Sequence, residues 1–169
     1  MSARENHRAL ASRQGSGAPE FHHGGCLCGY VRYRTSGKPE RTTICHCTFC
    51  QRLTGSAFLV EPVFVEANVE VFSGAVCTYD HRSADHGHTL TVSFCPKCGT
   101  HLTLAFERFP NVRGICGGTF DDPTWFKPDR HIFLESAVPW MVFPSDVDCY
   151  VRHALKIDGT PEKPGQTAV

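Results

Sequence analysis

Closely spaced cysteines are the feature that most constrains what this chain can fold into. Seven of its ten cysteines stand in three clusters, namely Cys26 and Cys28, then Cys45, Cys47 and Cys50, then Cys95 and Cys98. Thiolates separated by one or two residues can bind the same zinc ion from one tight turn. A structural zinc site takes four protein ligands, and a catalytic zinc keeps three and leaves one position open. Seven clustered thiols therefore predict two zinc ions per chain, one of each kind.

The composition favours one domain without a highly charged surface. The chain has 169 residues, which suits a single core. Lysine and arginine number 17, as do aspartate and glutamate, so no basic surface for nucleic acid is indicated. No apolar run is long enough to cross a membrane, and the first twenty residues lack the apolar stretch of a secretory signal. We expect a cytoplasmic protein without nucleic-acid or membrane partners, whose thiols bind metal rather than form disulfides.

Short alternating and β-branched segments predict an all-β fold. Thr89–Phe94 alternates most clearly, and turn-forming residues separate it from the other candidates. These are Val31–Arg34, Val63–Val65, Val69–Phe72, Leu102–Phe106 and Ile132–Leu134. One helical turn is expected at Gln51–Leu53, ended by Gly55.

Both ends of the chain are expected to be disordered, which leaves residues 23–157 as a single zinc-binding β domain. Residues 1–22 are polar and interrupted by glycine and proline, with a short helix as the alternative. Residues 158–169 hold two prolines, two glycines and almost nothing apolar. Neither end is expected to carry function.

The pair Cys95 and Cys98 is the strongest single metal signal. Gly99 follows directly, and glycine tolerates backbone turns that other residues resist. A redox-active pair is the alternative, but the βαβ pattern that usually accompanies one is missing. The pair Cys26 and Cys28 is weaker evidence, because two cysteines on opposite faces of a strand have the same spacing.

Cys45, Cys47 and Cys50 can occupy three corners of one tetrahedron and leave the fourth for a substrate. His46 could be a fourth ligand, a general base or an outward-facing side chain. Ligation is the least favoured of these roles, because adjacent side chains seldom point at the same ion. Arg52 could offset the thiolate charge or bind an anionic substrate, and a solvated arginine is the simpler reading.

Spacing alone does not decide which clusters share an ion. Cys47, Cys50, Cys95 and Cys98 could pair as the two knuckles of a zinc ribbon, which would leave three clustered cysteines unexplained.

The remaining cysteines and histidines are expected to be structural. The isolated cysteines are predicted to lie in the core, and two histidines in strand-like runs to be buried and hydrogen-bonded. The histidine-rich segment Asp80–His88 is predicted to be a polar hairpin or loop rather than a third metal site. The isolated cysteines are Cys77, Cys116 and Cys149, and the two histidines are His101 and His131.

Four motifs in a fixed order resemble the glutathione-dependent formaldehyde-activating enzyme family. They are Gly24–Gly29, Cys45–Phe58, Phe94–Thr100, and Gly118–Pro123 with His131–Phe133 and Pro139–Trp140. The resemblance covers most of the predicted domain. His101 departs from the small residue or proline expected after Gly99 and Thr100.

The resemblance implies a β-tent fold, in which small antiparallel sheets are pinned by zinc. It also implies a grouping of the cysteines into one closed structural site and one open catalytic site. By similarity, Cys26, Cys28, Cys95 and Cys98 hold the structural zinc, and Cys45, Cys47 and Cys50 hold the second zinc.

The activity that the resemblance implies is that of a zinc-dependent carbon–sulfur lyase. The family reaction joins formaldehyde to glutathione and gives S-(hydroxymethyl)glutathione, so the expected partners are a small thiol and an aldehyde. Two alternatives stay open. One is a non-catalytic zinc-binding interaction module, as in relatives of centromere protein V, and the other is a lyase or hydrolase with a different substrate, in which zinc activates water.

Overall fold

The computed structural model describes residues 20–84 and 86–165. Within these ranges the chain forms strands, one α-helix and three single-turn 3-10 helices. In chain order they are β1 (Phe21–Gly25), β2 (Arg32–Ser36), β3 (Arg41–Cys45), α1 (Thr48–Thr54), β4 (Leu59–Val65), η1 (Glu66–Asn68), β5 (Val69–Ser73), β6 (Cys77–Arg82), β7 (Thr89–Phe94), β8 (His101–Phe106), β9 (Val112–Ile115), η2 (Gly117–Thr119), β10 (Arg130–Ile132), η3 (Leu134–Ser136) and β11 (Asp148–Cys149).

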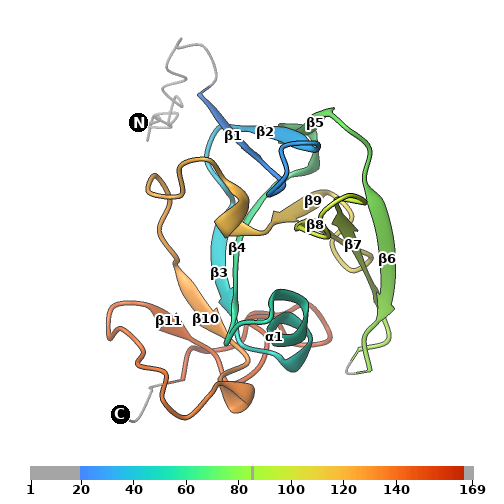
Figure 1. Cartoon of the computed structure of the whole chain (residues 1–169). Coiled ribbons are helices and arrows are strands. Elements are labelled where there is room, and N and C mark those ends of the chain that lie inside the picture. The colour runs from blue at the N-terminus through green and yellow to red at the C-terminus, as the bar shows by residue number, and fades with distance from the viewer. Residues whose placement is uncertain (1–19, 85, 166–169) are drawn as a thin grey trace, which may run out of the picture.

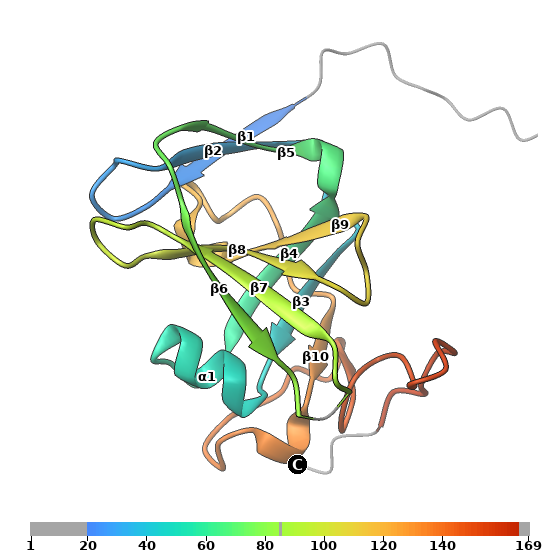
Figure 2. The ribbon, with the colours of Figure 1, turned by 90° about the vertical axis from the view of Figure 1, so that its right-hand side faces the viewer.

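The strands form one small and one large sheet. β1, β2 and β5 make the small antiparallel sheet, and the large sheet has the order β11-β10-β3-β4-β9-β8-β7-β6. Its pairings are antiparallel except those of β10 with β3 and with β11, which are parallel. In Figures 1 and 2 the small sheet lies at the top of the molecule and α1 at the opposite end. The predicted all-β fold class is confirmed, with the parallel pairings as an addition.

The helix α1 begins and ends at residues that suit those positions. The sulfur of Cys47 accepts a hydrogen bond from the backbone N–H of Cys50 at 3.4 Å, and Cys47 is thus the N-cap. Gly55 has a φ of 63° and terminates the helix, as predicted. The cluster of Cys45, Cys47 and Cys50 therefore spans the end of β3, the N-cap and the first turn of α1.

The segment Arg41–Cys45 is a central strand that the sequence analysis did not predict. β3 lies between β4 and β10, and Thr42 and Thr43 are buried in it. The predicted strand at Ile132–Leu134 is wrong beyond Ile132, because Phe133 adopts a left-handed conformation with a φ of 60° and Leu134 begins η3.

Two apolar cores flank the strands, and each includes cysteines from a different part of the sequence. The first core contains Cys26, Val31, Tyr33, Phe64, Cys95, Leu102, Ile115 and Phe120. The second contains Cys45, Cys50, Leu59, Leu104, Cys116, Ile132, Tyr150 and Ala154. The predicted metal ligands are thus built into the packing of the domain.

Both expected borders of the domain need correction. β1 begins at Phe21, so the ordered fold starts before residue 23, and residues 1–19 lie outside the described part of the chain. Residues 158–165 were expected in a disordered tail, yet Glu162 N–H donates to Ala154 at 2.9 Å and Gly165 N–H to Cys149 at 2.8 Å. Backbone hydrogen bonds hold this segment although it has few apolar side chains. Residues 166–169 lie outside the described range.

Candidate functional site

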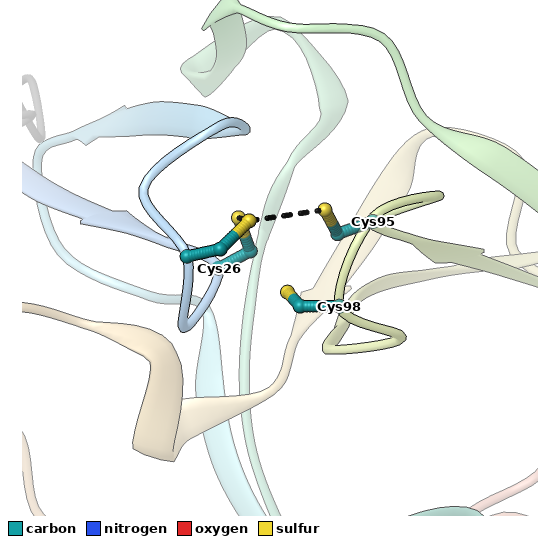
Figure 3. Close-up of side chains that lie close together, drawn as sticks. Cys26, Cys95 and Cys98 are labelled. Carbon is teal, nitrogen blue, oxygen red and sulfur yellow. Dashed lines mark hydrogen bonds between the residues drawn. The ribbon is translucent and has the colours of Figure 1, made fainter.

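Four cysteines distant in sequence meet between the two sheets. Cys26 and Cys28 lie in the loop between β1 and β2, and Cys95 and Cys98 lie in the turn between β7 and β8. The four sulfur atoms all lie within 4.8 Å of one another. Figure 3 shows the sulfurs of Cys26, Cys95 and Cys98 directed toward a common centre from the two loops. This group could therefore hold one metal ion that joins the small sheet to the large one.

The sulfur separations fit a tetrahedral zinc ion. A zinc ion with Zn–S bonds of about 2.3 Å has sulfurs at the tetrahedral corners about 3.8 Å apart. The sulfurs of Cys26 and Cys28 are 3.5 Å apart, and those of Cys28 and Cys95 are 3.8 Å apart. Four thiolates are also the soft donor set that zinc accepts.

Backbone and hydroxyl groups surround these sulfurs. Val31 N–H donates to Cys26 Sγ at 3.2 Å, and Lys97 N–H donates to Cys95 Sγ at 3.4 Å. The hydroxyl of Thr100 lies 3.2 Å from Cys98 Sγ, and hydrogen bonds from Thr100 lower the pKa of the Cys98 thiol to about 5. Such donors favour the thiolate, which is the form that binds metal.

A second group consists of Cys45, Cys47 and Cys50. Their sulfurs also lie within 4.8 Å of one another, and those of Cys45 and Cys47 are 3.5 Å apart. Cys45 and Cys50 are buried, and Cys47 is partly exposed. Among the described residues, neither group combines Cys47 or Cys50 with the Cys95 pair, so the zinc-ribbon pairing is not formed.

The three thiols of this group strongly affect each other's ionisation. The pKa of Cys47 is lowered to about 3, first by hydrogen bonds from the Cys45 and Cys50 thiols and then by backbone N–H groups. The pKa of Cys45 is raised first by its hydrogen bond to Cys47, and that of Cys50 first by its hydrogen bonds to Cys45 and Cys47; burial raises both pKa values further. A cation among the three sulfurs would favour the thiolate form of all three cysteines, which makes the group a suitable metal site.

The three-cysteine group opens into a cavity of about 740 Å³, a volume within the usual range for small-molecule sites. Its walls come from α1, from the β6–β7 hairpin and from β8 and β10. Phe49 on α1 stacks on His81 of β6, with ring centroids 4.4 Å apart. Three arginines line the cavity, Arg52, Arg82 and Arg108, and the charge of these walls suits an anionic ligand.

His46 does not belong to the three-cysteine group. It is fully buried, and its Nε2 lies 2.9 Å from Nδ1 of His131, which is buried as predicted. His101 was also expected to be buried, but it is only partly so, because it lines the cavity at the start of β8. Arg52 is exposed at the cavity wall.

All ten cysteines lie within the described residues and are free thiols. Cys116 and Cys149 are buried, as predicted for core residues. Cys77 is exposed, so its assignment to the core is wrong. It lies on β6, the edge strand of the large sheet, in which only His81 is partly buried.

Glu61 is a site residue that the sequence analysis missed. It is buried on β4 with 8% of its surface exposed, and it lines the same cavity as the three cysteines. Burial, with a smaller contribution from Cys47, raises the pKa of its carboxyl to about 7, against the opposing effect of Arg41. The available signal was a glutamate inside the otherwise apolar segment Phe58–Phe64.

The fold and the two sulfur groups define a mostly β protein with one closed and one open site that could hold metal. The family model for the glutathione-dependent formaldehyde-activating enzyme matches residues 21–136. The chain therefore belongs to this family, whose members are enzymes that activate formaldehyde with glutathione. A crystal structure of a Rhodobacter sphaeroides protein is similar at 19% identity and a TM-score of 0.48, covering 63% of this chain and 91% of that chain.

None of the helices in the described ranges is both long enough and apolar enough to cross a membrane.

Proposed function

We propose that this protein is a zinc-dependent carbon–sulfur lyase that interconverts S-(hydroxymethyl)glutathione with formaldehyde and glutathione. The observation that carries the proposal is the opening of the Cys45, Cys47 and Cys50 sulfurs into a cavity large enough for a tripeptide thiol. Three ligands leave one position of a tetrahedral ion for substrate. The family membership supports formaldehyde and glutathione as the substrates.

The residues of the cavity have separable tasks in this reaction. Cys45, Cys47 and Cys50 would hold a zinc ion, which when bound supplies the positive charge that stabilises a thiolate or polarises an aldehyde oxygen. Arg52 and Arg108 line the cavity and can bind carboxylates of the thiol substrate. Apolar walls, including Leu104 and Ile132, limit the entry of water.

The other four cysteines are assigned a structural role in this proposal. Cys26, Cys28, Cys95 and Cys98 would enclose the structural zinc completely, so no position remains for substrate. The proposal therefore includes two zinc ions per chain with different tasks.

The test is exchange spectroscopy by NMR on mixtures of formaldehyde and glutathione. The protein should accelerate the interconversion of adduct and free thiol beyond the uncatalysed rate. Cys47→Ser should abolish the acceleration, and Cys77→Ser, which changes an exposed cysteine outside both groups, should retain it. Wild-type protein loaded with two zinc ions that gives no acceleration would contradict the proposed reaction.

A further inference from the structure

The buried carboxyl group of Glu61 has no role yet in the reaction. Among the described residues, no hydrogen bond or ion pair to Glu61 is found, although it is more than nine-tenths buried. Burial disfavours the charged carboxylate, and the nearby charge of Arg41 opposes this effect. Glu61 is buried and lines the cavity, and this combination distinguishes it from the exposed acidic residues.

The sheet register places Glu61 on the cavity face beside the three-cysteine group. In the antiparallel pair of β3 and β4, Cys45 is opposite Leu59, and Thr43 is opposite Glu61. Opposed residues project from the same face of a sheet, and residues two positions apart share that face. Glu61 is therefore the diagonal neighbour of Cys45 across the two strands, and both residues line the cavity.

The neighbouring strand leaves room for this carboxyl group. β9 pairs with β4, and it carries Gly114 opposite Val63. A Cβ atom at Gly114 would collide with Oε1 of Glu61 and lie 2.9 Å from its Cδ. The missing side chain at Gly114 thus lets the Glu61 carboxyl lie against the β9 backbone while it still lines the cavity.

The charged and titratable groups that influence the Glu61 carboxyl are Arg41, Cys47 and Cys116. Burial raises its pKa to about 7, Arg41 lowers it and Cys47 raises it. Cys116 is a buried thiol whose pKa is raised to about 12, first by its own burial and then by Glu61.

We infer that Glu61 is a catalytic residue of the proposed reaction, in which its carboxylic acid donates a proton to the oxygen of formaldehyde. The sulfur lone pair forms the S–C bond, the π pair of C=O moves to oxygen, and the oxygen takes the proton from Glu61. The carboxylate then takes up the proton that the thiol gives up, so the acid is regenerated. In the reverse direction the acid first gives its proton to the sulfur, and the carboxylate so formed accepts the hydroxyl proton as the S–C bond breaks. This role rests on the proposed function.

The test compares Glu61→Gln with wild-type protein in the same NMR exchange assay. The amide keeps the shape of the side chain but cannot donate and recover a proton, so the catalysed rate should fall by about 100-fold. Metal content and thermal unfolding should stay at wild-type values, because the neutral acid already lacks charge. Glu70→Gln is the matched control, since Glu70 is an exposed residue of β5 outside the cavity, and its rate should be unchanged.

Two further measurements separate a proton-transfer role from a structural one. Glu61→Ala should be slow and regain part of its rate when acetate is added, because a free carboxylic acid can enter the space left by the side chain. Infrared spectra below neutrality should contain a protonated-carboxyl band that is missing in Glu61→Gln.

The outcomes discriminate between the proposals. A fully active Glu61→Gln protein, or an infrared band that persists in this variant, would remove the role of Glu61 and leave the lyase assignment in place. A fall to one metal ion per chain in Glu61→Gln would make Glu61 a ligand instead of a proton donor. Wild-type protein without acceleration would remove both proposals.

Discussion

Replacing one cysteine in each group should give two different losses of stability. In Cys98→Ser the four-cysteine group between the sheets loses one of its sulfurs, and in Cys47→Ser the three-cysteine group at the end of β3 loses one. Both variants are expected to fold at low temperature, because the apolar cores remain. The difference lies in the length of chain that each proposed metal ion would close into a loop.

The magnitude follows from loop-closure entropy. A link between Cys28 and Cys95 closes 67 residues, and treated like a disulfide it stabilises the fold by about 4 kcal/mol. A link between Cys45 and Cys50 closes only five positions of the chain and stabilises it by about 2 kcal/mol in the same treatment. At roughly 2–4 °C per kcal/mol for a chain of this size, Cys98→Ser should lower Tm by about 8–16 °C. Cys47→Ser should lower it by about half as much.

The assay is thermal unfolding followed by circular dichroism, with zinc measured in the same samples. Cys77→Ser serves as the control and should leave Tm within about 2 °C of wild type, because Cys77 is exposed on an edge strand. Equal losses of Tm in Cys47→Ser and Cys98→Ser, each with one zinc ion retained, would refute the division into one structural and one catalytic site.

Three further perturbations probe the cavity and its surroundings. Gly114→Ala should displace the Glu61 carboxyl and lower the exchange rate by at least tenfold. Gly118→Ala is the control, because a Cβ atom there meets open space, and its rate should be unchanged. Equal rates in the two variants would contradict the claim that Gly114 makes room for the Glu61 carboxyl. Burial and the charge of Arg108 lower the pKa of His153 to about 4. The unfolded state therefore binds a proton at His153 more readily than the folded state. The free energy of unfolding should fall as the pH drops from 6.5 to 4, by at most about 3 kcal/mol. Denaturant unfolding of His153→Gln should show a smaller fall over this range, and an unchanged fall would contradict the assignment. Arg52→Ala should raise KM for glutathione up to about tenfold with little change in kcat, because an exposed ion pair contributes about 1 kcal/mol. A fall in kcat alone would argue against binding of a glutathione carboxylate by Arg52.

The cysteine clusters could be read from the sequence because their chemistry is local. Two or three thiols within six residues are forced to lie near one another, whatever the rest of the chain does. Their grouping could not be derived in this way, because it depends on the loop at Cys26 meeting a turn some seventy residues later. The family resemblance supplied the grouping in which the sulfurs are in fact found.

Features that depend on sheet position were predicted less well. Cys77 has the same kind of neighbours as a core residue, yet β6 is the edge of the sheet and leaves it exposed. Glu61 breaks an apolar run, and only the register with β3 shows that it faces the cavity. Local sequence does not determine strand order or register, since both result from long-range pairing.

The four-cysteine group also sets an order of events during synthesis. Cys28 leaves the ribosome 67 residues before Cys95, which at 5–20 residues per second corresponds to roughly 3 to 13 s. During that interval the first two thiols have no second pair with which to enclose an ion. The proposed structural zinc would therefore join the two sheets only after the β7–β8 turn has emerged.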